Sequence, residues 1–181
     1  MYSEILILAI LQPGPRHGYE LKKDIDQALG GMVFLSNKTL YQAIKRFEEL
    51  GAVTRQVVIQ QGKPNRHIYH LTERGVELLH ASLRDFPLEQ AASDAEFFTR
   101  VAFFAVLEVK ERPAILCTRL TSLKTGLEYL EGLQQLVETQ ACAPIVPTLT
   151  NAQRILAFQT RRIRDEYAWI ASWLEEFYIP R

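Results

Sequence analysis

The side chains best suited to chemistry on a partner molecule lie between residues 36 and 66. They are cations, amides and hydroxyls: Ser36, Lys38, Thr39, Tyr41, Gln42, Lys45, Lys63 and Arg66. Lysine and arginine neutralise phosphates, whereas amide and hydroxyl groups form hydrogen bonds with base edges. This set therefore has the chemistry of a surface that binds double-stranded DNA, provided that the fold gathers its members on one side.

A helix is predicted to carry the first six of these side chains. Apolar residues at steps of four, three and three form one stripe, which Ser36 or Asn37 can cap and Gly51 can end. The stripe consists of Leu40, Ile44, Phe47 and Leu50. Lys38, Tyr41, Gln42 and Lys45 lie off its phase and project outward. The alternative is an ordinary solvated face, because any exposed helix carries lysine and glutamine.

The elements around this helix favour the DNA-binding interpretation. Two helices are predicted before it, over 3–11 and from about 17 to 29. Two β-rich runs follow it, over 53–60 and 65–71, with a turn and a basic tip between them. Three helices followed by a hairpin are the order of a winged helix-turn-helix, whose third helix enters the major groove. Residues 36–75 hold seven basic and three acidic side chains, so the local charge agrees.

Composition limits the other possibilities. The 181 residues carry 21 basic and 21 acidic side chains, so the net charge gives no bulk signal for nucleic acid. Two cysteines, Cys117 and Cys142, form no disulfide framework and fit a reducing compartment. The apolar run 5–11 is too short to cross a bilayer. We expect a cytoplasmic protein that makes no use of a membrane.

Three stretches resemble the PadR-like transcriptional regulators. They are GPRHGYEL over 14–21, TLYQAIKRFEELGAV over 39–53 and GKPNRHIYHLTERG over 62–75. The resemblance implies that Tyr41 and Lys45 contact the DNA backbone, and that Lys63 and Arg66 act from the wing. Lys38-Thr39 and Gln42 depart from the family pattern, which often has Gly-Ser and Pro there. A base preference therefore cannot be carried over, and Lys38 is a hypothetical additional contact.

Other residues of these motifs receive structural roles. We expect Gly18 to permit a close approach of two helices. Tyr19 either lies in the core, which we favour, or offers its hydroxyl to a phosphate. Tyr69 and Leu71 should pack inward while His70 faces out, because strand side chains alternate. Thr72 is predicted to cap a helix over 73–84.

No catalytic or metal-binding pattern accompanies these motifs. His67 and His70 are three apart in a strand and point to opposite faces, and neither they nor His80 have a cysteine nearby. Motifs for a nucleotide loop, a serine nucleophile or a zinc site are absent from the sequence. The sequence predicts no enzyme, no cofactor and no metal.

The second half is predicted to be helical. One helix is expected over 93–108 and a longer one from Pro113, with apolar residues at heptad spacing. A loop over 141–148 and a last helix from about 150 to 177 complete an antiparallel hairpin. A hairpin alone leaves apolar surface exposed, and a second copy would bury it. The predicted dimer interface comprises Phe97, Phe104, Leu123, Leu127, Ile163, Ile170, Leu174 and Phe177.

Together these observations predict a mainly α (α+β) fold: a winged helix-turn-helix domain over 1–86 and a helical dimerisation domain over 87–181. The expected function is transcriptional regulation by a homodimer, a repressor on a near-palindromic operator. A small aromatic or apolar effector would be bound by Phe98, Trp169 and Trp173, although such rings are more often dimer core. The alternative is a winged-helix module that binds another protein and has lost DNA binding.

Overall fold

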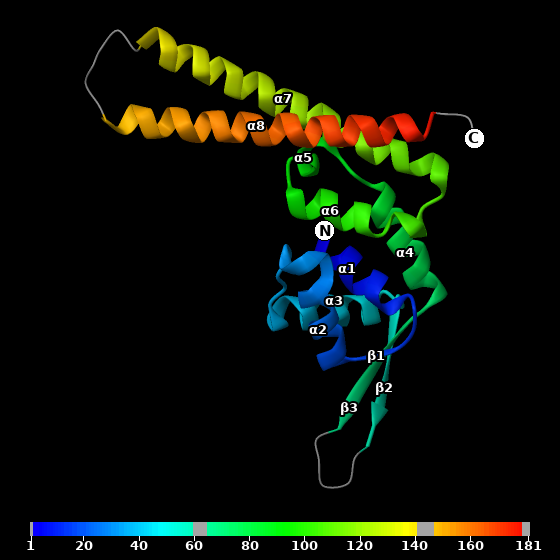
Figure 1. Cartoon of the computed structure of the whole chain (residues 1–181). Coiled ribbons are helices and arrows are strands. Elements are labelled where there is room, and N and C mark those ends of the chain that lie inside the picture. The colour runs from blue at the N-terminus through cyan, green and yellow to red at the C-terminus, as the bar shows by residue number, and fades with distance from the viewer. Residues whose placement is uncertain (1, 60–64, 141–146, 179–181) are drawn as a thin grey trace. The chain divides into compact units, whose positions relative to one another are not determined.

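The computed structural model describes residues 2–59, 65–140 and 147–178. The chain divides into two compact units (Figure 1). The first comprises Met1–Phe86 and Ser93–Glu111, and the second comprises Pro87–Ala92 and Arg112–Arg181. The segment 93–111 thus belongs with the N-terminal elements.

Helix α1 (Tyr2–Leu11) is the centre of the first unit. It contacts α2 (Gly18–Gln27), α3 (Asn37–Glu49), α4 (Glu73–Arg84) and α6 (Asp94–Ala102). Ile5, Leu6, Ile7 and Leu8 are completely buried although they are consecutive. A helix that is apolar all round is stable only when neighbours cover every side, and these four helices do so.

Helix α3 forms as its sequence predicts. The Ser36 hydroxyl accepts a hydrogen bond from the Thr39 N–H at 3.1 Å and caps the first turn. Leu40, Ile44 and Phe47 are buried, and Gly51 takes a φ of 68° just after the helix. Glycine adopts this left-handed conformation without a steric penalty, so it ends the helix where the strand must begin. The outward face of α3 is thereby fixed.

The wing is part of a three-stranded antiparallel sheet of order β1-β3-β2. Strands β2 (Val53–Val58) and β3 (Arg66–Leu71) pair as predicted, with Val53 opposite Leu71. Strand β1 (Arg16–His17) is an addition that the sequence did not predict, and it pairs with β3. Thr72 caps α4 as expected, because its hydroxyl accepts from the Gly75 N–H at 3.1 Å.

The segment 93–111 is not one helix, so the prediction of a helix over 93–108 is wrong. Ser93 caps α6, but the helix ends at Ala102 because Phe103 leaves helical geometry, with φ −108° and ψ 22°. Two 3₁₀ turns follow, η2 (Phe104–Val106) and η3 (Val109–Glu111). The bend buries Phe104 and Leu107.

A buried arginine ties α6 to the end of α4. The Arg100 guanidinium is completely buried and donates to the Glu96 carboxylate at 2.6 Å and to the Asp85 carbonyl at 2.8 Å. It also stacks over the Phe86 ring, 4.6 Å from its centre. Burial raises the pKa of Glu96, but the Arg100 guanidinium and the Tyr2 N–H outweigh it and hold that pKa below its usual value.

The second unit is built on an antiparallel helical hairpin, α7 (Arg112–Gln140) and α8 (Pro147–Glu176), together with the short α5 (Leu88–Ala91) (Figure 1). The hairpin was predicted. The loop expected over 141–148 is wrong at Pro147 and Thr148, which begin α8, and its first six residues lie outside the described residues. Proline is favoured in the first turn, where its missing N–H costs nothing.

Polar pairs hold the two long helices in register. Arg119, nearly all buried, donates to the Glu166 carboxylate at 2.7 Å and to the Ala91 carbonyl at 2.6 Å. Arg164 pairs with Glu131 at 2.7 Å. Gly126 of α7 faces Ile163 of α8, where an added Cβ atom would meet the Ile163 side chain at an ordinary contact distance of 3.6 Å. Across the described residues no helix is both long and apolar enough to span a membrane.

Candidate nucleic-acid interface

The outward face of α3 presents the polar side chains that the sequence selected. Lys38, Thr39, Gln42 and Lys45 are exposed, and the Tyr41 ring is 48% exposed. Ser36 is exposed as well, but its hydroxyl caps the helix and lies 2.8 Å from the Thr39 hydroxyl. The face therefore offers two amines, an amide and a phenol to an incoming partner.

Not every cation near this face is available. Arg46 pairs with Glu4 at 2.6 Å, and Arg55 pairs with Glu48 at 3.2 Å. Lys45 lies 3.9 Å from Glu49, a long contact between two exposed groups that contributes little. Within the described part of the chain, Lys38 and Arg66 have no acidic partner. Lys38 and Arg66 are thus the cations freest to neutralise a phosphate, with Lys45 weakly held.

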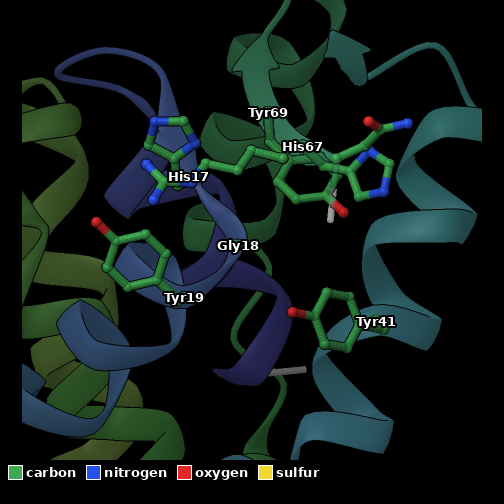
Figure 2. Close-up of a pocket in the computed structure, with 8 residues that line it drawn as sticks. His17, Gly18, Tyr19, Tyr41, His67 and Tyr69 are labelled. Atoms are coloured by element: carbon green, nitrogen blue, oxygen red, sulfur yellow. The ribbon is translucent and has the colours of Figure 1, made fainter. Parts of the chain in front are cut away.

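A shallow hollow of about 200 Å³ opens beside this face. Strand β1, the start of α2, α3 and β3 all contribute to it; its lining is His17, Gly18, Tyr19, Tyr41, Asn65, Arg66, His67 and Tyr69. Figure 2 shows His17 and Tyr19 on one side, His67 and Tyr41 on the other, and the Tyr69 ring between them. The hollow thus joins the helix face to strand β3 of the wing.

Gly18 sets the position of Tyr41. A Cβ atom at Gly18 would lie 3.1 Å from the Tyr41 hydroxyl oxygen and 3.5 Å from the Tyr69 ring. Figure 2 shows the Tyr41 hydroxyl directed toward Gly18. The sequence suggested that Gly18 permits a close approach of two helices. The atoms closest to Gly18 are instead those of the Tyr41 and Tyr69 side chains.

The three tyrosines of the hollow differ in burial. Tyr19 is 62% exposed, so the prediction that it lies in the core is wrong. Tyr69 is buried as predicted, while Leu71 and His70 are both half-buried. Burial, with the nearby Tyr41 and Glu48, raises the pKa of the Tyr69 phenol, so it stays neutral at ordinary pH.

Sequence reasoning missed His17 and His67 as members of this site. The Nδ1 atom of each ring is shielded from solvent and has no hydrogen-bond partner among the described residues. The only signal in the sequence was the position of His17 inside the first family-like stretch. Of the predicted wing residues, Arg66 is exposed at the start of β3, and Lys63 lies outside the described residues.

The predicted dimer residues divide into two groups. Phe97 and Phe104 are buried inside the first unit, and Leu123 and Ile170 are buried in the single chain. Their assignment to an interface between copies is therefore corrected, because their surface is already covered. The remaining four are half-buried on the hairpin: Leu127, Ile163, Leu174 and Phe177.

The predicted effector residues lie in different units. Phe98 is half-buried on α6 and makes an edge-to-face contact with Phe97 at 5.2 Å. Trp169 and Trp173 are adjacent on α8, with ring centres 5.6 Å apart and planes tilted by 37°. With Ser172 and Glu176 they line an open hollow of about 280 Å³. Of the three predicted effector residues, only the two tryptophans belong to the same unit.

Helix α3 with an exposed polar face, preceded by α1 and α2 and followed by a β-hairpin, defines a winged helix-turn-helix protein. Residues 7–81 match the model of the transcriptional regulator PadR-like family, and a PadR family transcription regulator from Clostridium difficile is 31% identical, with 44% of this chain and 80% of that one covered and a TM-score of 0.39. The chain belongs to the PadR-like family of transcriptional regulators.

Two further matches come from Bacillus subtilis. The negative transcriptional regulator PadR is 27% identical over 127 residues, which cover 70% of this chain and 69% of the relative. Its crystal structure in complex with operator DNA is matched at 23% identity over 96% of this chain and 98% of that one, with a TM-score of 0.45. That regulator has also been solved with p-coumaric acid, at 21% identity over 99% and 97% of the two chains and a TM-score of 0.42.

Proposed function

We propose that this regulator is a repressor that binds a near-palindromic DNA operator as a homodimer. The observation that carries the proposal is the outward face of α3, where Lys38, Tyr41, Gln42 and Lys45 are exposed together. Arg66, at the end of β3 that adjoins the wing loop, extends this surface, and we propose the same role for Lys63. Ser36 and Thr39 stabilise the first turn of α3. They lie at the N-terminal end of this helix, where we expect them to contact the DNA backbone.

A stripe of apolar side chains on α8 supports a dimer. At about 100° per residue, Ile155, Phe158, Trp169, Trp173 and Phe177 fall within an arc of roughly 100°. Ile155 and Phe158 are 60% and 61% exposed. Arg162 and Glu166 fall in the same arc and interrupt the stripe, which therefore consists of two apolar patches. Exposed apolar patches mark interaction surfaces. We propose that a second copy covers this α8 stripe, together with the half-buried Leu127, Ile163 and Leu174 beside it.

A dimer would set the operator geometry. Two copies of α3 would enter successive major grooves about 34 Å apart and bind two half-sites related by symmetry. Occupancy of the operator would block transcription. The division of labour that we propose is DNA binding by the N-terminal domain over 1–86 and dimerisation by residues 87–181.

An effector is a second proposal, based on the paired tryptophans. Trp169 and Trp173 present two adjacent aromatic surfaces at an open hollow of α8. A small aromatic or apolar molecule could stack there. Because these rings also belong to the α8 stripe, such a molecule would alter the dimer and so release the operator.

The experiment that tests the function is a titration of the purified protein with DNA from upstream of its own gene, against a random fragment of equal length. Salt is varied from about 50 to 200 mM. Specific binding that weakens steeply with salt is expected, because each phosphate contact adds roughly 0.9 to the slope of log affinity against log salt.

A double variant, Lys38→Ala with Lys45→Ala, locates the surface. It should lose affinity for both fragments and lower the salt slope by about 2 per protomer, which is about 4 for the dimer, because each amine removes one phosphate contact. The matched control is Lys110→Ala, an equally exposed lysine of the first unit that pairs with Glu108. Unchanged affinity in the double variant would refute the α3 surface. Absence of binding by the unsubstituted protein, even at low salt, would favour the protein-binding module.

A further inference from the structure

The amide of Gln42 lies at the centre of the outward face of α3. At about 100° per residue, it falls within about 15° of the direction opposite to the buried Leu40, Ile44 and Phe47. It is exposed, and it makes no hydrogen bond with any residue that the structure describes. Its donor and its acceptor are therefore both available to the molecule that this face meets.

The phosphate-binding groups of α3 all lie on one side of Gln42. Going round the helix, Lys38 and Lys45 are about 40° and 60° from Gln42, and the Tyr41 phenol is about 100° from it in the same sense. All three side chains are exposed. If these groups hold one DNA strand by its backbone, the central Gln42 is directed at the floor of the groove beside that strand.

On the other side of Gln42 the polar groups are engaged within the fold. Arg46 pairs with Glu4 of α1 at 2.6 Å, and the Thr39 hydroxyl lies 2.8 Å from the Ser36 hydroxyl. Arg46 and Thr39 are about 40° and 60° from Gln42 in this direction. Gln42 is therefore the uncharged side chain of this face whose hydrogen-bonding groups are free among the described residues.

The charge of α3 changes along its length. Its first turn holds no acidic side chain and includes Lys38, whereas Glu48 and Glu49 lie in its last turn. Phosphates repel an acidic helix end, so the N-terminal half is the part of α3 that enters a groove. Gln42 lies in the second turn and thus in the half that approaches the bases.

A glutamine amide matches one base edge of the major groove in both its groups. Adenine presents an acceptor, N7, beside a donor, its N6 amino group. Guanine presents two acceptors there, cytosine a single donor and thymine a single acceptor. Glutamine can therefore donate from Nε2 to N7 and accept at Oε1 from the amino group of an adenine, but it cannot form both hydrogen bonds with any other single base.

We propose that Gln42 is a specificity-determining residue and binds an adenine in each half-site of the operator. The proposal rests on the function proposed above and adds the base that the same surface selects. Lys38, Tyr41 and Lys45 fix the position of α3 on the backbone, but phosphate contacts carry no base preference of their own. Proline, which the family pattern often has at this position, has no side-chain donor or acceptor, so the preference does not follow from the family.

The first test selects duplexes from a random library with the unsubstituted protein and with Gln42→Ala. The unsubstituted protein should retain an adenine in each half-site, and its replacement should lower affinity roughly fivefold to a hundredfold per half-site. Gln42→Ala should lose this preference at that position alone and keep the same salt slope, because the amide is uncharged. Alanine is the strongest helix former and the position is exposed, so α3 should remain folded.

The second test examines the contact at the level of atoms. In the selected duplex, 7-deazaadenine replaces the adenine and removes its N7 acceptor while keeping its base pair. The unsubstituted protein should bind this duplex several-fold more weakly, whereas Gln42→Ala should bind the two duplexes equally. Gln42→Glu, whose carboxylate only accepts, should prefer cytosine at the same position, because cytosine offers a donor there.

Two variants serve as controls. Lys45→Ala should weaken binding of every duplex alike and keep the adenine preference. Gln12→Ala, at an exposed glutamine that follows α1, should change neither. Selected half-sites without an adenine, an adenine preference that Gln42→Ala retains, or full affinity for the 7-deazaadenine duplex would each overturn the role of Gln42 while leaving DNA binding intact. Absence of binding to any duplex would overturn both proposals.

Discussion

The two units of this regulator achieve stability in different ways. In the first unit, α1 is enclosed on all sides, and α3 and β3 pack against it with Leu40, Ile44 and Tyr69 buried. In the second unit, α8 has 30 residues, yet Ile170 and Thr160 are its only buried positions among those whose side chains are described. The first unit closes its own core, whereas the second leaves large apolar side chains of α8 exposed.

Glycine substitutions expose this contrast most strongly. Gly75→Ala would place a Cβ atom 2.2 Å from the Ala52 carbonyl oxygen and 2.5 Å from the Leu71 side chain. Backbone cannot yield cheaply there, so we expect a loss of about 3 kcal/mol in unfolding free energy, from the upper range for overpacked cores. Urea denaturation followed by circular dichroism measures it.

The matched substitution in the second unit is Gly132→Ala on α7. Among the described residues nothing lies within 4 Å of the added Cβ atom. Alanine should stabilise the helix by roughly 0.5–1 kcal/mol, since glycine is the weaker helix former. Equal destabilisation by the two substitutions would contradict the contrast between a closed core and an open hairpin.

The next largest effect concerns the α8 stripe. Ile155→Asp with Phe158→Asp should break the dimer, because burying each large apolar side chain contributes roughly 1.5–3 kcal/mol. Sedimentation equilibrium should show dimerisation weakened by at least about a hundredfold. The control is Val109→Asp in the first unit, whose side chain is 62% exposed. If the double variant dimerises normally, another face joins the copies.

The smallest expected effect concerns Gly18 in the first unit. Gly18→Ala would bring a methyl group to 3.1 Å from the Tyr41 hydroxyl and displace that ring. The Tyr41 side chain can shift at its hydroxyl end, so the unfolding free energy should change by less than about 1 kcal/mol. DNA affinity should fall a few-fold, because the proposed contact of Tyr41 with the DNA backbone is lost. Tyr41→Phe, which keeps the ring in place, isolates the hydroxyl. A Gly18→Ala variant with full affinity would remove Tyr41 from the interface.

Regular elements of the first unit were predictable because each carried its own local signal. The stripe ending in Phe47, the Ser36 cap and Gly51 together determined α3 before any tertiary contact was known. Strand β1 has two residues, too few for alternation to show. The exposure of Tyr19 could have been foreseen, because residues two apart on a helix, such as Tyr19 and Leu21, do not share a face.

Other features depend on contacts that no local pattern encodes. Consecutive apolar residues around Phe104 have no helical period, and the chain buries them by bending. Heptad spacing indicates that the Ile170 side chain is buried, but it does not show whether the same chain or a second copy buries it. In this structure residues of the same chain bury it. The α3 side chains were identified from residue type and phase, whereas His17 and His67 reach the site only through pairing of β1 with β3.

One hydroxyl limits how this winged helix can vary. Thr72 Oγ1 donates to the Gly51 carbonyl at 2.7 Å and accepts from the Gly75 N–H at 3.1 Å. It thereby connects the end of α3, the end of the wing and the start of α4. In a library randomised at positions 51, 72 and 75, the surviving combinations should not be products of independent choices. Serine at position 72 can keep both hydrogen bonds, but valine cannot. With valine at 72, the residues tolerated at positions 51 and 75 would no longer be linked through a shared hydroxyl.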